Sequence, residues 1–348
     1  MANSYLTKDF GSAGNKKTMT FSFWVKRGTT GADGDFFIGD AQTGYPSHFI
    51  LFQSDDKLSI RSQAGVSGET LRFTTLRKFI DTTAWYHIVI AIDTTQASAG
   101  DRCKVWVNGV QETAFSTSDQ TNGFGQNSDT YFNNGSSDEY IGKYASDYAR
   151  FTLAHYHFVD GTAYTPSTFG ETDSTSGIWK PKTNPSVTYG THGFFLKFQN
   201  SGALGTDSSG NSKTWTVNGN LKQSISTPSN KFPNLNPRGT ATGYGTAVYT
   251  LDSGTTALMT TGVNRVAPID MCFQGGKWYW ECKIEKANNS STLGVYMTDF
   301  SSPKRIEQFN ADLALQSAAN GGKRAVSFLT SASSSQIQNA GSTVTYGA

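Results

Sequence analysis

Charge is scarce in this sequence. Asp, Glu, Lys and Arg make up 16% of its 348 residues, against about 25% in typical soluble domains. The net charge is +2, and no cluster of Lys and Arg stands out, which argues against nucleic-acid binding. No apolar run approaches the length of a membrane span, so no membrane insertion is expected. The N-terminus lacks the pattern of a secretory signal, which predicts synthesis in a cytoplasm without a signal peptide.

Cysteine is equally scarce. Cys103, Cys272 and Cys282 are odd in number and far apart, which excludes a disulfide framework and a four-ligand zinc site. The sequence also contains no Gly-x-Ser-x-Gly nucleophile turn and no phosphate-binding loop. These absences leave no cofactor to expect, with calcium as the one alternative considered below.

What the chain does contain is strand-forming and turn-forming residues. Ser, Thr, Asn and Gly account for 138 residues, and aromatic residues for 13%. Many aromatics with little charge argue against disorder. Thr, Tyr, Phe and Trp favour strands, whereas Gly, Asn and Ser favour turns. The composition therefore predicts an all-β protein with many connections.

Three regions follow from the pattern along the chain. Residues 1–200 are expected to form a β-sandwich, 201–240 a polar connector rich in Ser, Asn, Gly and Pro, and 241–348 a smaller β unit. Ser116–Ser137 reads as a long polar loop, and loops of that length are usually functional or mobile. The clearest strand of the last region is Gly276–Lys286, with Ser291–Met297 as its expected partner.

Several strands of the first region are distinct. Trp85–Asp93 is almost continuously apolar, as expected for a strand in a sandwich core. Asn108-Gly109 predicts a tight hairpin turn, with Gln111–Phe115 as the return strand. In Ala149–Val159, alternation places Phe151, Leu153, His155 and His157 on one face, and the two histidines have a spacing that metal ligands can use. Packing or hydrogen-bonded histidines are the favoured interpretation, because no third ligand follows nearby.

Residues 1–200 resemble the concanavalin A-like lectin/glucanase superfamily in its laminin-G-like or pentraxin-like form. The resemblance rests on FSFWVK (21–26), on WYHIVIAID (85–93) followed by KVWVNGV (104–110), and on EYIGK (139–143) with FTLAHYHFVDGTAYTPSTFG (151–170). It implies a jelly-roll sandwich of two antiparallel sheets.

A narrower resemblance covers Asp160–Pro237. Its long strings, DGTAYTPSTFGETDSTSGIWKPK and GFFLKFQNSGALGTDSSGNSKTWTVNG among them, are similar to virion and tail-fibre proteins of marine tailed phages. The chain departs from that pattern at Ser226, where Asp is more usual. From Gly275, GGKWYWECKIEK and TLGVYM resemble the central strands of a SPRY domain, but the following strands of that domain are not recognisable before the chain ends.

Catalysis is not expected. Glucanases need two carboxylates about 5–5.5 Å apart, commonly spaced along one strand with a third acid between them. Glu281 and Glu285 are the nearest match, but Lys283 stands between them. We therefore interpret both acids as the solvated face of a strand.

The candidate ligand-binding residues lie in loops. Asp33 with Asp35, and Asn133 and Asn134 with Asp138, supply oxygen groups that could hold calcium, although turn chemistry explains them equally well. Exposed aromatics beside amides and carboxylates favour glycan binding, with packing under the loops as the alternative. The glycan-binding candidates are Tyr45, Phe124, Tyr131, Phe132, Asn133, Asn134, Asp138 and Tyr144.

Taken together, these observations predict a structural virion protein of a tailed phage, in a tail fibre or surface appendage, whose lectin-like domain binds host surface glycan. The expected partners are other virion proteins, further copies of the chain (a trimer would suit a fibre) and the glycan. A non-binding architectural joint or capsid decoration is the first alternative, and a polysaccharide depolymerase is the second.

Overall fold

The structure is a computed structural model that describes residues 3–31, 35–40, 47–63, 69–118, 125–135 and 137–230, and six strands between 248 and 346. The chain divides into two compact units, Met1–Phe232 and Pro233–Ala348. Each unit is described by itself.

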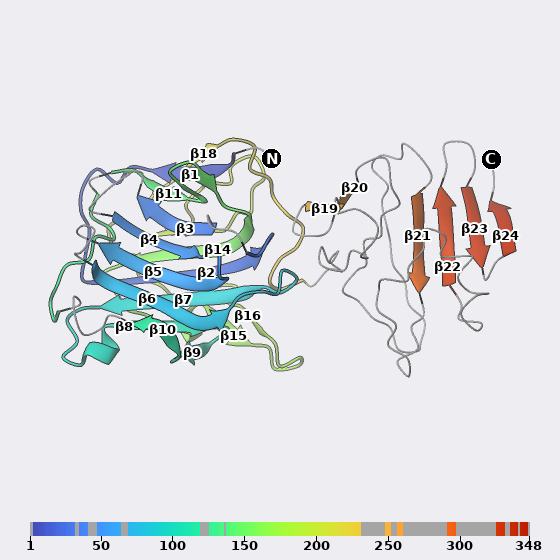
Figure 1. Ribbon diagram of the computed structural model, residues 1–348. Coiled ribbons are helices and arrows are strands. Elements are labelled where there is room, and N and C mark those ends of the chain that lie inside the picture. The colour runs from blue at the N-terminus through green and yellow to red at the C-terminus, as the bar shows by residue number, and fades with distance from the viewer. Residues whose placement is uncertain are drawn as a thin grey trace. The chain divides into compact units, whose positions relative to one another are not determined.

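Two antiparallel sheets form the first unit (Figure 1). The larger sheet has eight strands in the order β10 (Phe115–Ser118), β6 (Glu69–Lys78), β5 (Lys57–Gln63), β4 (Ser47–Phe52), β3 (Asp35–Asp40), β11 (Glu139–Ile141), β1 (Tyr5–Lys8) and β18 (Thr216–Asn218). The smaller sheet has six in the order β17 (Phe194–Leu196), β14 (Phe151–Asp160), β2 (Thr18–Arg27), β7 (Tyr86–Asp93), β8 (Cys103–Val107) and β9 (Val110–Glu112).

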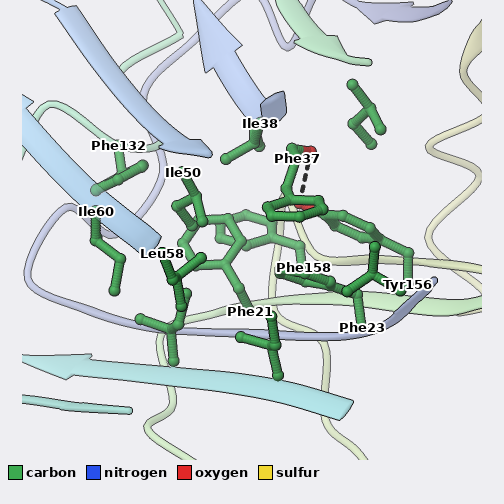
Figure 2. Close-up of a cluster of buried hydrophobic side chains, with 14 of the residues drawn as sticks. Phe21, Phe23, Phe37, Ile38, Ile50, Leu58, Ile60, Phe132, Tyr156 and Phe158 are labelled. Carbon is green, nitrogen blue, oxygen red and sulfur yellow. Dashed lines mark hydrogen bonds between the residues drawn. The ribbon is translucent and has the colours of Figure 1, made fainter. Parts of the chain in front are cut away.

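The core lies between these sheets. Because successive side chains of a strand point to opposite faces, alternate residues of β2, including Phe21 and Phe23, enter the same cluster as Ile50 of β4. Figure 2 shows these side chains meeting from the two sheets, with the Tyr156 hydroxyl donating to the Phe37 carbonyl at 3.2 Å. No α-helix occurs in the described residues, which hold only the short 3₁₀ turns η1 (Ala99–Asp101) and η2 (Pro166–Thr168). The predicted all-β, antiparallel fold is confirmed.

The hairpin after β8 forms as the sequence predicts. Asn108 and Gly109 both adopt positive φ, 50° and 81°, which a tight two-residue turn requires. The return strand differs from the prediction for Gln111–Phe115. It breaks into β9, which ends at Glu112, and β10, which pairs with β6 of the other sheet. The chain thus crosses from one sheet to the other within a stretch that looks like one strand.

Strand β14 contains a β-bulge that its alternating sequence conceals. The pairing with β2 shifts between Ala154 and His157, and His155 has a φ of 47°. The extra residue reverses the alternation, so Tyr156 and Phe158 face the core. The predicted common face of His155 and His157 with Phe151 and Leu153 is therefore wrong.

The outer face of the six-stranded sheet is covered by the chain that follows β14. Phe169 and Val159 form a second buried cluster there, against which Tyr164 and Tyr189 pack. The hairpin of β15 (Gly170–Thr172) and β16 (Trp179–Pro181) lies over the same sheet. The Trp179 indole donates to His87 Nδ1 at 2.9 Å. This face is therefore occupied by the protein itself.

Part of the predicted connector belongs to the sandwich. Trp215 is 2% exposed and joins the main core, where its ring meets Phe10 and Phe194. Strand β18 then pairs with β1. The polar composition of this stretch hides these anchoring residues.

The described strands of the second unit form two small antiparallel sheets. One pairs β19 (Val248–Leu251) with β20 (Thr256–Met259); the other joins β21 (Ser291–Tyr296), β22 (Ala325–Thr330), β23 (Ser335–Asn339) and β24 (Ser342–Tyr346) in sequence order. The predicted strand Gly276–Lys286 lies outside the described residues, so its pairing with 291–297 stays a prediction; β21 pairs with β22 on one side.

Candidate functional site

Several predicted residues fall outside the part of the chain that the structure describes. These are the glycan candidates Tyr45 and Phe124, the calcium candidate Asp33, the acids Glu281 and Glu285, and the cysteines Cys272 and Cys282.

Phe132 and Asn133 serve the interior rather than a binding surface. The Phe132 ring is fully buried against Phe21. The Asn133 amide donates to Asp160 Oδ1 at 2.9 Å, and its oxygen lies 3.0 Å from His192 Nδ1. These contacts tie the loop to the end of β14. The structure therefore corrects the prediction that these two side chains contact glycan.

Tyr131, Asn134 and Asp138 lie at the surface. Tyr131 and Asn134 are partly exposed and Asp138 is exposed. The backbone N–H of Tyr131 donates to the Ser62 hydroxyl at 2.8 Å, which ties this loop to β5. Their role in glycan binding stays a prediction.

Asp35 is held in an internal ion pair. Its Oδ2 lies 3.4 Å from the Arg27 guanidinium, and its Oδ1 accepts the Arg150 backbone N–H at 2.8 Å. Burial raises the pKa of this carboxyl despite Arg150 and Arg27. Both oxygens therefore already have protein donors, and the structure gives Asp35 a packing role instead of a calcium-binding one.

The two histidines of β14 do not form a metal site. His157 stacks on Phe195 at 3.8 Å, and its Nδ1 lies 2.8 Å from the Tyr189 hydroxyl. Burial lowers the pKa of both His155 and His157. Among the described residues, no group of three or more His, Cys, Asp or Glu side chains could hold a metal ion.

Tyr144, one of the predicted glycan candidates, belongs to a surface that the sequence did not reveal as a whole. It lies in a short hairpin of β12 (Lys143–Tyr144) and β13 (Asp147–Tyr148). Its ring stacks on Phe36 at 4.9 Å, contacts Phe49 at 5.7 Å and lies over Gly39, which has no side chain to displace it. Phe36, Gly39 and Phe49 belong to β3 and β4, on the face of the eight-stranded sheet opposite the core.

Lys143 and three more tyrosines continue this surface. The Lys143 Nζ lies 4.6 Å from the ring centre of Tyr5, 5.0 Å from that of Tyr140 and 5.7 Å from that of Tyr148. Tyr5 and Tyr140 meet edge to face at 5.5 Å. We call Tyr5, Tyr140, Tyr144, Tyr148 and Lys143 the tyrosine platform; all five side chains are partly exposed.

Strand pairing explains why these residues meet. Leu6 pairs with Ile141, and both enter the core, so Tyr5 and Tyr140 point outward. Tyr140 also pairs with Gly39, which places the Lys143 and Tyr144 contacts next to each other. The string EYIGKY, with a core isoleucine between outward tyrosines, is the signal that could have indicated this face.

Beneath the platform, on the inner side of the same strands, lies a buried polar cluster. His48 Nε2 lies 2.8 Å from Glu139 Oε2, and His48 Nδ1 lies 3.9 Å from Asp40 Oδ2. All three side chains are at most 3% exposed. Burial raises the pKa of Asp40 to about 6. Burial by itself would lower the pKa of His48, but Glu139 and Asp40 outweigh it and raise that pKa.

Comparison with known proteins agrees with the fold. Residues 2–161 match the family model described as the concanavalin A-like lectin/glucanases superfamily. The first unit thus has the antiparallel jelly-roll sandwich of the concanavalin A-like fold, and residues 2–161 are similar to that superfamily. None of the curated proteins compared with the chain matches it.

Solved structures with some likeness include a native heptameric SAP-like pentraxin from Limulus polyphemus, at 14% identity and a TM-score of 0.33, over 56% of this chain and 88% of that chain. A Trypanosoma rangeli sialidase in complex with the inhibitor DANA has 15% identity and a TM-score of 0.29, over 44% of this chain and 22% of that chain. In the described residues, no helix is long and apolar enough to cross a membrane.

Proposed function

We propose that the first unit is a lectin-like module that binds glycan through the tyrosine platform. The observation that carries the proposal is the row of partly exposed tyrosines on the outer face of the eight-stranded sheet, whereas the six-stranded sheet is covered by its own chain. Tyrosine suits a sugar, because its ring offers an apolar surface and its hydroxyl a hydrogen-bonding group.

We further propose that the chain is a virion protein of a tailed phage, in a tail fibre or surface appendage, and that the glycan belongs to the host surface. The similarity of Asp160–Pro237 to such proteins supports this role. A flat platform binds a single glycan weakly. Several copies held close together would raise the overall affinity by about 10² or more without new contacts.

The module would bind the glycan without cleaving its glycosidic bonds. Asp40 of β3 and Glu139 of β11, which pair with each other beside Tyr140, are buried on the inner side next to His48. They are therefore not placed to protonate or attack a sugar on the outer face. Release of reducing ends from a bound polysaccharide would favour a depolymerase instead.

A glycan array probed with the purified chain, displayed at high density, tests the proposal. Tyr140→Ala removes a central ring of the platform and should reduce binding about tenfold or more, whereas Leu76→Ala, at an exposed residue of β6 outside the platform, should not. If no glycan binds at avid density, or if Tyr140→Ala binds like the wild type, the proposed function is wrong.

A second candidate, an architectural contact with another copy of the chain, is favoured by one observation. Val110 and Ile178 are 67% and 62% exposed. They lie on the same side of the unit, because Gly109 contacts the Trp179 ring. An apolar edge strand is a typical site of subunit contact. Val110→Asp should then lower the oligomeric state measured by light scattering.

A further inference from the structure

We infer that the glycan bound by the tyrosine platform is acidic, and that Lys143 binds the carboxylate or sulfate group of its sugar. The inference rests on the proposed function and adds the substrate class. It starts from the unusual position of the Lys143 ammonium group.

In the described part of the chain, Lys143 Nζ has ring faces around it and no carboxylate within ion-pair distance. Four other lysines of the unit are paired instead. Lys16, Lys57, Lys104 and Lys180 lie 2.7–3.0 Å from the carboxylates of Asp129, Asp55, Asp101 and Asp173. The platform therefore holds an ammonium group for which the described residues supply no counter-ion.

The three rings hold this group in place. The face of an aromatic ring is negative and attracts a cation, so Tyr5, Tyr140 and Tyr148 restrict where the ammonium group can go. A tyrosine ring cannot accept the three N–H donors as a carboxylate would. A charged ligand that meets an ordered, partly exposed cation loses less side-chain freedom on binding than one that must order a free lysine.

The other charged residues near this face are compatible with the binding of an anionic group. The Arg61 guanidinium lies over Phe49 at 5.6 Å, on the side of Tyr144 away from the strand β11. Glu139, the acid beside Tyr140, is turned to the inner face and held by His48. Asp147, which pairs with Tyr144 in the hairpin, is exposed and, like Glu139, lies four residues from Lys143 in sequence. A sugar ring on the tyrosines would thus place an acidic substituent beside Lys143.

The test uses the full chain on an array that pairs each acidic glycan with a neutral counterpart. Galacturonan oligosaccharides pair with their methyl esters, and sulfated galactan oligosaccharides with unsulfated ones. Lys143→Met keeps most of the hydrocarbon stem and removes the charge. Lys57→Met is the matched control, because it changes net charge equally but removes a lysine of the eight-stranded sheet that is paired with Asp55. Thermal unfolding verifies that each variant is folded.

We expect acidic glycans to bind about tenfold or more tightly than their neutral partners, as a charge-assisted contact implies. Lys143→Met should remove this preference, Lys57→Met should keep it, and added salt should weaken it. Which acidic pair responds separates carboxylate from sulfate recognition.

Three results would overturn the inference. Equal binding of neutral and acidic members, with Tyr140→Ala still inactive, leaves the proposed function standing and removes the acidic specificity. Equal losses in Lys143→Met and Lys57→Met indicate general charge attraction rather than a site. Absence of binding to every glycan at avid density removes the proposed function, and the acidic specificity with it.

Discussion

The buried cluster of Asp40, His48 and Glu139 should make the sandwich more stable in mild acid than in base. Asp40 is 1% exposed, and burial raises its pKa from 3.8 to about 6. Between these values the native state keeps a proton that the unfolded chain releases. Stability therefore falls as the pH rises through this window, and the loss persists above it.

The size of the effect follows from the shift. One pKa unit corresponds to about 1.4 kcal/mol, so the rise at Asp40 costs the native state about 3 kcal/mol at pH 8. His48 acts in the same direction. Its pKa is raised, so the stability that its protonated form contributes below the ordinary pKa is lost as the pH rises through the native value.

Asp40→Asn removes the ionisation while keeping the side-chain shape. We expect the variant to be more stable than the wild type by up to about 3 kcal/mol at pH 8, and by about 0.5 kcal/mol at pH 4, where native Asp40 is already protonated. Urea unfolding followed by tryptophan fluorescence measures both differences. The exposed Asp138 supplies the control, because Asp138→Asn changes net charge equally and should show no such pH dependence.

One result would refute this reasoning. If Asp40→Asn is less stable than the wild type at pH 8, the attraction between ionised Asp40 and protonated His48 exceeds the cost of burying the carboxylate. The cluster would then be a stabilising ion pair, and stability would rise with pH through the same window.

Two further predictions concern the packing of the first unit. Arg27 has no exposed side-chain area and pairs with Asp35 and Asp56. Arg27→Leu should therefore lower the free energy of unfolding in urea by about 3–5 kcal/mol, because it leaves Asp35 buried without its partner. Asp35→Asn added to Arg27→Leu should recover much of this loss, and failure to do so would contradict the role of the ion pair. Gly109 has a φ of 81°, and a Cβ there would lie 3.1 Å from the Trp179 ring, so Gly109→Ala should destabilise by more than the about 1–2 kcal/mol of backbone strain alone. Gly177→Ala, at a φ of 70° with open space around it, isolates the backbone contribution, and equal losses in the two variants would show that the Trp179 contact is unimportant.

Local pattern was enough to predict several strands and one turn of the first unit. Trp85–Asp93 became β7 because its apolar residues enter the core, and Asn108-Gly109 turned as its positive φ values require. The bulge in β14 escaped prediction, since one inserted residue reverses a period of two without changing composition. The break between β9 and β10 was missed for a related reason: the choice of sheet depends on a partner far away in the chain.

Of the platform residues, only Tyr144 was predicted as a glycan candidate. Tyr5 is remote in sequence from the others and meets Tyr140 only because β1 pairs with β11. Phe132 was misjudged in the opposite sense. Its neighbours are polar, yet its ring fills a space beside Phe21. Local polarity thus identified the loop, but it did not predict the direction in which each side chain points.

The position of β1 also bears on how this protein is made. Strand β1 lies between β11 and β18, and Tyr5 pairs with Asn218, which is synthesised more than 200 residues later. Strand β1 must therefore remain unpaired on one side until β18 has been synthesised. Contacts between such distant residues slow folding, and strand edges left open in the interval favour aggregation. The surface proposed to bind glycan includes Tyr5, so it would be among the last parts of the sandwich to be completed.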